Sequence, residues 1–278
     1  MTKESNNCNL LTLPSGKLRY KLTNDYMFRA VFQKNENALK GLLSALLSIP
    51  KNEIKEVTIL NPIILGETID DKTCILDLHI RLNNNELINI EMQVEDLGNW
   101  PERSITYLGR SFDQVKSGGD YSDICTTIHI GILDFNLSHL TPEFYSEFKL
   151  MNAKNHEIYS DKFVLSVINL NQIELATEED RKYGIDHWAR LFKADTWEAI
   201  KKMAQENAYI SDAAETLLQS NQDLKIRSYC EAVEEARRVR RGLERLVAEK
   251  DEALAEKDEA LAEKDAEIAR LKALLENK

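Results

Sequence analysis

The chain has 278 residues, of which 43% are hydrophobic, so it is long enough for one large domain or for an ordinary domain with an appendage. That hydrophobic content is sufficient for a buried core and excludes a chain that is disordered throughout. The formal net charge of −11 argues against general electrostatic adhesion to nucleic acid or to acidic membranes, although a local basic patch or a metal ion can offset the field at an enzyme site.

Four scattered cysteines form no C-x-x-C pair, which argues against a disulfide scaffold and against a zinc ribbon. The sequence shows no N-terminal signal-like segment and no run of about 18 apolar residues, which predicts a cytoplasmic protein that does not associate with a membrane. It also lacks a G-x-x-x-x-G-K-[ST] loop, so we expect no nucleotide cofactor.

The first part of the chain predicts an arm followed by two helices. Residues 1–20 are polar and without a sustained period, as is typical of a flexible N-terminal arm. A helix then begins after Thr23 or Asn24, either of which offers an N-cap oxygen, and carries the apolar residues Met27, Phe28, Val31 and Phe32. A second helix begins near Asn37, and Pro50 stops it.

The middle of the chain alternates between strand and helix patterns. Three strand-like runs are EVTILNPI, TCILDLHIRL and ELINIEMQV. A helix is predicted from Arg103 to about Lys116, with one face formed by Ile105, Leu108, Phe112 and Val115, and Gly118-Gly119 after it. The run ICTTIHIGILDF is nearly all apolar or β-branched, which predicts a strand covered on both faces. This order of elements indicates an α/β layered core.

The third part contains two more strand-like runs, FYSEFKLMN and FVLSVINL, on either side of a polar turn near residues 152–156. From Thr177 the pattern is helical. These helices form either a cap on the α/β part or a small satellite subdomain, and we assign residues 21–175 to the core and 176–240 to the helical part.

Residues 241–278 contain a seven-residue repeat, EKDEALA, EKDEALA, EKDAEIA. One seam position holds Val247, Leu254, Leu261, Ile268 and Leu275. The second holds Leu243, Lys250, Lys257, Lys264 and Leu271, so its centre is lysine. A stable coiled coil normally has two apolar positions per heptad. The segment is therefore either a lone solvated helix laced with Glu–Lys pairs or a weak coiled coil that makes a homo-oligomer.

The stretch LDLHIRLNNNELINIEMQ, residues 76–93, predicts a hairpin with acids inside its strands. Side chains alternate along a strand, and matching the two apolar faces fixes the parity of pairing. A three-residue loop, residues 83–85, places Leu82 opposite Glu86. Asp77 then lies directly across from Glu91, with their Cβ atoms about 5 Å apart, and Gln93 lies just beyond.

Two opposed carboxylates repel each other, and a divalent cation between them reverses the sign of that interaction. Mg²⁺ binds through one or two carboxylates together with water and substrate phosphate, and it can activate the attacking water. The alternative interpretation is an amphipathic hairpin whose polar face merely meets water.

Several segments together resemble the recombination-promoting nuclease (Rpn) and putative transposase family of bacteria, a branch of the PD-(D/E)XK phosphodiesterases. They are TNDYMFRAVF, KTCILDLHIRLNNNELINIEMQ and ERSITYLGRSFDQVKSGGDYSDICTTIHIGILDF, and later FYSEFKLMNAKNHEIYSDKFVLSVINL with the charged helical tail. The resemblance covers most of residues 20 to 240, and INIEMQ following an LD strand is its specific part. It implies an α/β, restriction-endonuclease-like PD-(D/E)XK core, a mixed sheet flanked by helices, with a C-terminal helical region and the heptad tail.

The resemblance also implies site residues. Asp77 and Glu91 become catalytic metal ligands for Mg²⁺, or for Mn²⁺ or another divalent cation, and the backbone carbonyl of Met92 is a possible third ligand. Gln93 occupies the catalytic position that is usually lysine. A neutral amide there can position water by hydrogen bonding but supplies no positive charge.

Three further side chains are candidates. Asp25 is a possible second acidic group behind the metal ligands, or simply a first-turn acid that the helix dipole favours. Arg103 and Arg110 lie seven apart and are possible contacts for DNA phosphates, or surface salt-bridge residues. The hypothesis is a Mg²⁺-dependent DNA endonuclease in DNA mobility, recombination or defence. The alternative is an inactive nuclease fold that oligomerises or binds a partner through its C-terminal helix.

Overall fold

The computed structural model describes residues 13–60, 63–64, 74–75, 77–83, 85–113 and 119–276. Contacts divide the chain into one compact unit that ends at Cys230 and a second that begins at Glu231. The domain boundaries expected after residues 175 and 240 do not coincide with this division.

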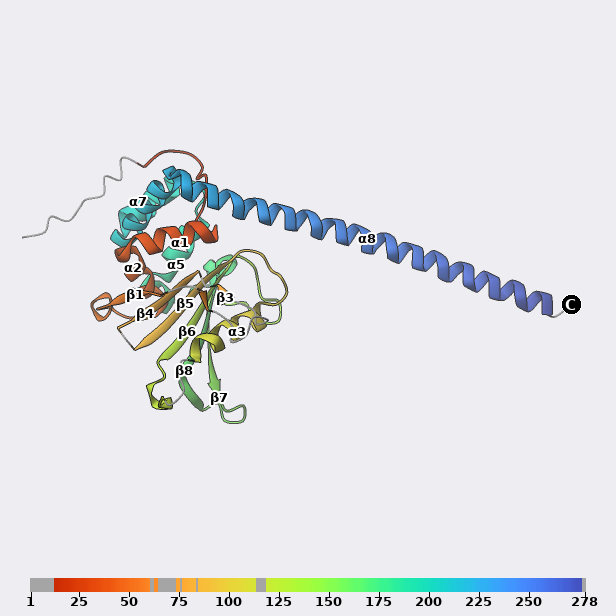
Figure 1. Ribbon diagram of the computed structural model, residues 1–278, viewed down its shortest axis with the longest axis horizontal. Helices are drawn as coiled ribbons and strands as arrows, with labels where there is room; N and C mark the ends of the chain where they lie inside the picture. Colours follow the sequence, from red (N-terminus) through yellow and green to blue (C-terminus); the bar gives the residue numbers. More distant parts are fainter. Residues whose placement is uncertain are drawn as a thin grey trace, which may run out of the picture. The chain divides into compact units, whose positions relative to one another are not determined.

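A six-stranded mixed sheet forms the centre of the first unit, in the order β1-β4-β5-β6-β8-β7 (Figure 1). Its strands are β1 (Val57–Ile59), β4 (Leu78–Leu82), β5 (Glu86–Gln93), β6 (Thr126–Leu133), β7 (Tyr145–Met151) and β8 (Ile158–Asn169). The central pairs β5–β6 and β6–β8 are parallel, whereas the β1–β4, β4–β5 and β7–β8 pairs are antiparallel. A separate small ladder joins β2 (Ile63–Ile64) to β3 (Cys74–Ile75).

Each run predicted to form a strand does so in the structure, although some of these runs contain more than one strand. In the described part of the chain before residue 95, the three strand-like runs correspond to β1 to β5. The apolar run that follows forms β6, which has neighbours on both sides and is largely buried on both faces, as its composition predicts. The later hairpin is β7–β8, with its turn in the predicted polar segment.

Helices α1 (Asp25–Lys34) and α2 (Glu36–Leu46) follow the expected pattern. Asn24 caps α1, because its side-chain oxygen accepts a hydrogen bond from the Met27 N–H. The apolar residues of α1 point into the core against the apolar face of the hairpin, which includes Ile80 and Ile90. One face of the sheet is thus covered by helices.

Helix α3 (Trp100–Phe112) lies on the other face, against β6 and β8, and begins earlier than predicted. Pro101 stands in its first turn, where a missing N–H costs nothing. The predicted apolar face is wrong at Ile105, which is 56% exposed. The side chains that α3 buries are instead Trp100, Ser104, Tyr107, Leu108 and Ser111. The helix ends at Phe112, with Asp113 as its non-helical C-cap, so it ends earlier than the predicted end near Lys116. Val115 and Gly118 lie outside the described residues.

The helical stretch after the sheet consists of α4 (Glu178–Tyr183), α5 (Ile185–Lys193), α6 (Trp197–Glu206) and α7 (Ala208–Gln222). It is a cap and not a satellite, because its apolar residues share one core with α1, α2 and the sheet. Phe28 and Phe32 of α1 pack against Trp188 and Phe192 of α5, with ring centroids 5.8 to 6.3 Å apart.

Residues 13–20 differ from the expected flexible arm. Leu13, Leu18 and Tyr20 are buried, and the Leu18 N–H donates to the carbonyl of Asp195. Three apolar side chains in a polar segment, together with backbone pairing to residues 195–197, account for this order. The rest of the predicted arm lies outside the described residues.

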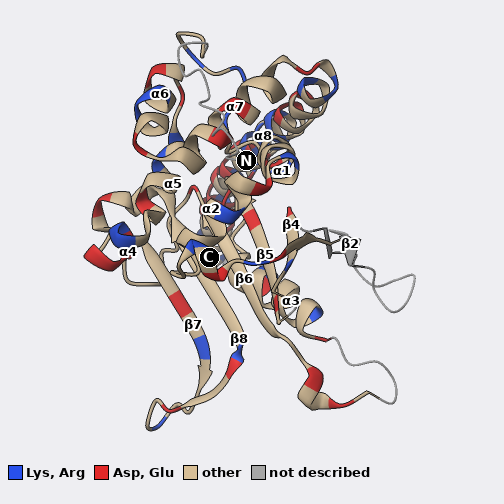
Figure 2. Cartoon of the chain, turned by 90° about the vertical axis from the view of Figure 1, so that its left-hand side faces the viewer, with Lys and Arg blue, Asp and Glu red and all other residues tan. Residues whose placement is uncertain are grey.

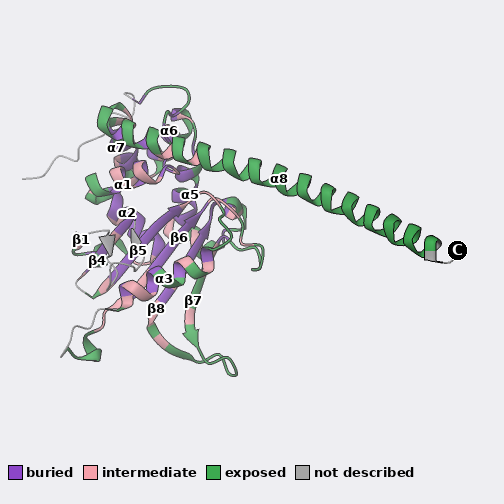
Figure 3. Cartoon of the chain, turned by 45° about the vertical axis from the view of Figure 1, so that its right-hand side comes forward, coloured by how far each residue is buried: buried purple, intermediate pink, exposed green. Residues whose placement is uncertain are grey.

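Within the described residues, the 3₁₀ segments η2 (Lys51–Glu53), η3 (Tyr121–Asp123) and η4 (Leu170–Leu175) connect these elements. The last helix, α8 (Leu224–Glu276), starts in the first unit and supplies the second. In Figure 3 the central strands β5 and β6 are coloured largely as buried, and α8 is exposed along almost its whole length. Among the described residues no helix is long and apolar enough to cross a membrane.

Candidate active site

The hairpin of β4 and β5 has the register that its sequence predicts. Leu82 pairs with Glu86 and Leu78 pairs with Ile90. Asp77 precedes the first residue of β4 by one position, so it stands at the continuation of the ladder, opposite Glu91. Asn83 in the loop has a φ of 49°, a left-handed conformation that asparagine tolerates better than most residues.

Asp77 is tied to the neighbouring strand through its side chain. Its Oδ2 accepts a hydrogen bond of 2.8 Å from the Met92 N–H. The Leu60 N–H donates to the carbonyl of His79. The backbone N–H and carbonyl of His79 therefore point to β1, and those of Leu78 point to β5. By the alternation of the ladder, the N–H and carbonyl of Met92 point to the edge where Asp77 lies.

Glu91 is almost completely buried, with its side chain 4% exposed. Its Oε1 accepts a hydrogen bond of 2.7 Å from Nε of Arg103, and Nη2 of Arg103 lies 2.7 Å from the same oxygen. Its Oε2 has no hydrogen-bond partner among the described residues, and Nε2 of His129 lies 3.8 Å from it. Asn89 on the same face is also buried and donates to Ser111 of α3. The interpretation in which this polar face merely meets water is therefore wrong, because α3 covers it.

The carboxyl groups of Asp77 and Glu91 both have pKa values above their ordinary range. Burial raises the pKa of Asp77 to about 8, the Met92 N–H and Arg29 oppose this shift, and the charges of Glu91 and Asp25 add to it. Burial also raises the pKa of Glu91, against the attraction of Arg103. Perturbed acids that share one site are characteristic of functional centres.

The pKa of Asp77 predicts how stability depends on pH in the presence of a chelator. The unfolded chain releases this proton near the ordinary value of 3.8, whereas the folded chain holds it to about 8. The contribution of Asp77 to the free energy of unfolding is therefore complete below about pH 4 and is lost as pH rises toward 8, by at most about 1.4 kcal/mol per pH unit.

We expect Asp77→Asn to gain stability relative to the wild type as pH rises from 5 to 8, as measured by urea unfolding at each pH. Asp113→Asn, at an exposed position after α3, is the matched control and should show no such trend. A difference between wild type and Asp77→Asn that is constant with pH would contradict this prediction.

The other residues expected at the site lie at varying distances from the two acids. Asp25, the first residue of α1, is close enough for its charge to raise the pKa of both acids. Gln93 ends β5, and its Nε2 donates to the carbonyl of Glu95 at 3.0 Å. Arg103 contacts Glu91, but Arg110 lies two turns further along α3, about 10 Å away along the helix axis.

Sequence reasoning missed two side chains at the site. Arg29 lies with its Nε 3.8 Å from Oδ1 of Asp77. The signal was its position four residues after Asp25, on the same face of α1. His129 is fully buried beside the rings of Trp100 and Tyr107. Burial, and then the charge of Arg103, lowers the pKa of His129 to about 3, so this histidine is neutral.

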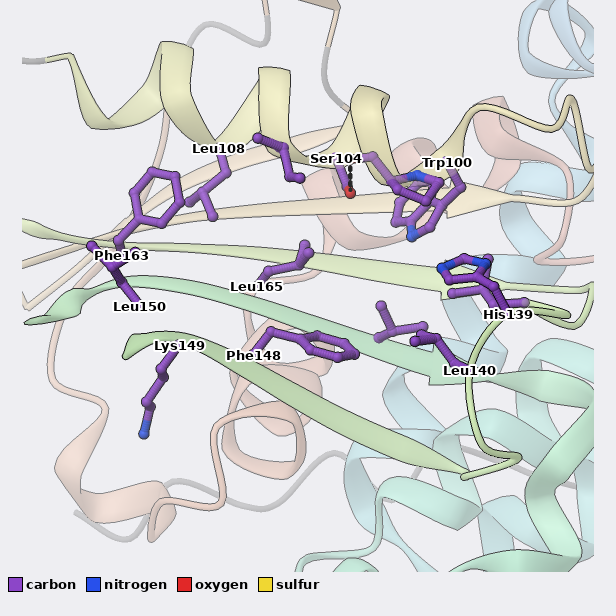
Figure 4. A pocket seen from close by; sticks show the side chains of 14 residues that line it. Trp100, Ser104, Leu108, His139, Leu140, Phe148, Lys149, Leu150, Phe163 and Leu165 are labelled. Carbon is purple, nitrogen blue, oxygen red and sulfur yellow. Dashed lines mark hydrogen bonds between the residues drawn. The ribbon is translucent and has the colours of Figure 1, made fainter. Parts of the chain in front are cut away.

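An apolar cavity of about 300 Å³ lies between α3 and the β7–β8 hairpin (Figure 4). Its labelled lining includes Trp100, Leu108, Phe148, Phe163 and Leu165. Asp77 and Glu91 do not line this cavity. It therefore lies apart from the acid pair, and no carboxylate of the described residues lines it.

The donor set fits a hard divalent cation. Asp77 and Glu91 offer carboxylate oxygens, the carbonyl of Met92 faces the same edge, and Oε2 of Glu91 is buried without a hydrogen bond from any described residue. Oxygen donors of this kind are typical of Mg²⁺ and Mn²⁺. Within the described part of the chain, no three His, Cys, Asp or Glu side chains gather as a metal cluster, so a cation would rely on two carboxylates and the backbone.

A family model for PD-(D/E)XK nuclease family transposases matches residues 22–241. The chain belongs to this family. The resemblance read from the sequence and the PD-(D/E)XK fold class are thus confirmed, and the mixed six-stranded sheet with flanking helices agrees with them. PD-(D/E)XK nucleases typically use divalent metal ions, and their substrate is DNA. No curated protein and no solved structure matches the chain.

Proposed function

We propose that this chain is a Mg²⁺-dependent DNA endonuclease that acts in DNA mobility, recombination or defence. The observation that carries the proposal is the place of Asp77, one residue before the Leu78–Ile90 pair and bound through Oδ2 to the Met92 N–H, beside Glu91, whose buried Oε2 accepts no hydrogen bond from a described residue. Asp77, Glu91 and the Met92 carbonyl would hold the metal. When bound, the metal would polarise the phosphodiester and make water a better nucleophile.

The protein's own residues prepare this site. Arg103 fixes the Glu91 carboxyl group by occupying Oε1, which leaves Oε2 available. The Met92 N–H holds Asp77 in place through Oδ2 and leaves Oδ1 facing Arg29. Gln93 can orient a water molecule through its carboxamide, once its hydrogen bond to Glu95 is exchanged.

The test is incubation of the purified chain with supercoiled plasmid, with Mg²⁺, with Mn²⁺ and with a chelator. Nicked and linear products that depend on the divalent cation support the proposal. Plasmid that stays intact with both cations, at protein concentrations where binding is saturated, counts against it.

One observation favours a second candidate, an inactive nuclease fold that binds a partner through its C-terminal helix. The side chain at the lysine position is neutral and is engaged by the Glu95 carbonyl. Titration calorimetry with Mn²⁺ separates the two candidates. Binding that disappears in Asp77→Asn supports the nuclease, whereas the absence of any binding supports the inactive fold.

The heptad tail is proposed to associate weakly with a second copy. Its apolar seam residues Val247, Leu254, Leu261 and Ile268 are between 49% and 59% exposed, so they are available for a partner helix. Lysine occupies the alternate seam position and weakens that association. Replacing Lys250, Lys257 and Lys264 with leucine should therefore give a stable oligomer, measured as molar mass by light scattering.

The matched control for this substitution is the chain truncated after Glu249, which should be a monomer at every concentration. A triple variant that stays monomeric at high concentration would contradict the proposed role of the tail.

A further inference from the structure

Two arginines stand at the acid pair, and they differ in how their hydrogen-bond donors are used. Arg103 places Nε and Nη2 on Glu91 and lies over the ring of Tyr107, 4.8 Å from its centroid. Arg29 is 3.8 Å from Asp77, which is longer than a hydrogen bond. Its buried Nε has no hydrogen-bond partner among the described residues. Within the described part of the chain, the buried Nε is therefore an unsatisfied donor beside the site, and the accessible 26% of the side chain is the part that a substrate can reach.

We propose that Arg29 binds a phosphate group of the nucleic-acid substrate next to Asp77, and so supplies the positive charge that Gln93 cannot. This inference rests on the proposed function, because it names a residue that recognises the substrate of that same site.

The position of Arg29 suits this role. Its side chain is 26% exposed, so it is partly packed and partly accessible. Its guanidinium lies 5.4 Å from the ring centroid of Tyr26, which itself stacks on Tyr229 of α8 at 4.7 Å and 25°. A guanidinium held in this way loses little freedom on binding, and its planar fork matches two oxygens of a phosphate.

The charge of the chain as a whole does not favour a phosphate. The chain carries a net charge of −11, and on α4 and α6 basic and acidic residues are interspersed (Figure 2), so these helices offer no field of one sign. The acidic side chains gathered at the site, with Asp25 near Asp77 and Glu91, repel a phosphate whenever they are ionised. An arginine that is always charged and within reach of Asp77 offsets this repulsion locally.

The experiment measures binding of a fluorescently labelled DNA duplex by anisotropy, in a chelator so that no cleavage occurs, over a range of salt concentrations. Arg29→Gln should weaken binding about tenfold or more, because a charge-assisted hydrogen bond is lost. It should also reduce the slope of log K against log salt by about one. Arg29→Lys should keep the wild-type slope and lose part of the affinity, because it keeps the charge but not the fork.

Arg181→Gln, at an exposed position on α4, is the matched control and should leave the affinity nearly unchanged. Wild-type affinity and slope in Arg29→Gln overturn the inference, and so does a loss of affinity with no change in slope, because that indicates a structural effect. If Arg29→Gln does not fold, Arg29→Lys decides: full wild-type affinity overturns the bidentate contact.

The outcomes separate this inference from the proposed function. DNA binding that depends on Arg29, without any cleavage in Mg²⁺ or Mn²⁺, supports the phosphate contact and counts against the endonuclease. Cleavage in Mg²⁺ or Mn²⁺, with DNA binding that does not depend on Arg29, supports the endonuclease and counts against the phosphate contact. A wild-type chain that binds no DNA overturns both.

Discussion

Asp77→Asn and Glu91→Gln are each expected to lower the rate of Mg²⁺-dependent DNA cleavage by about a hundredfold or more. The metal contributes several kcal/mol of transition-state stabilisation, and each 1.4 kcal/mol is about a factor of ten in rate. Both substitutions remove a carboxylate charge while keeping the shape of the side chain. Single-turnover cleavage of plasmid by equal amounts of folded protein measures the effect.

The control for this experiment lies on the same strand. Glu86→Gln removes a carboxylate from the other end of β5, where the ladder places Glu86 opposite Leu82, and should cleave at close to the wild-type rate. Calorimetry with Mn²⁺ should show weakened binding for Asp77→Asn and Glu91→Gln but not for Glu86→Gln. Equal cleavage by wild type and by the two acid variants would contradict the assignment of these residues.

The acid pair could be predicted because its geometry is local. Asp77 and Glu91 belong to one hairpin, and the alternation of apolar residues together with a short loop fixes the register of β4 against β5. No information from other elements is needed to bring the two carboxyl groups to the same face.

The partners of these acids could not be predicted in the same way. Arg103 reaches Glu91 only because α3 packs across β6 and β8, and Arg29 reaches Asp77 only because α1 lies on the sheet. Both arrangements depend on the packing of elements far apart in sequence. The place of His129 at the site could not be predicted from the sequence, because a histidine in an apolar strand has the same sequence pattern whether it lies near an acid or only among apolar side chains.

The errors in the fold have similar causes. The predicted start of α3 at Arg103 lies after Pro101, although proline is favoured in a first helical turn. The order of residues 13–20 comes from backbone pairing with residues 195–197, almost two hundred positions away. Contacts of this kind leave no local pattern in the sequence.

Trp100 connects the packing of α3 to the acid pair, and Gly131 makes room for it. A Cβ atom added at Gly131 on β6 would overlap Cζ2 of Trp100 and come within 2.5 Å of Cη2. The Trp100 side chain is buried and packed with Leu133 and Val167, so the ring has little space to move. Trp100 begins α3, and Arg103 lies one turn further on.

Gly131→Ala is therefore expected to lower the free energy of unfolding by about 1–3 kcal/mol, the usual cost of overpacking a core. It should also displace the start of α3, and the guanidinium of Arg103 should then move relative to the carboxyl group of Glu91. A displacement of about 1 Å near a reacting centre can cost about a hundredfold in rate, so cleavage should fall well beyond the loss of folded protein. Urea unfolding and single-turnover cleavage measure the two effects.

A second substitution distinguishes steric overlap from other effects of the alanine. Trp100→Leu removes the ring, so the double variant Gly131→Ala/Trp100→Leu should be more stable than the sum of the two single changes predicts. Gly109→Ala is the matched control, because an added Cβ on that helical glycine meets no atom within 4 Å. It should raise stability by up to about 1 kcal/mol, since alanine favours the helix. A Gly131→Ala variant with wild-type stability and activity would show that Trp100 can move without disturbing Arg103.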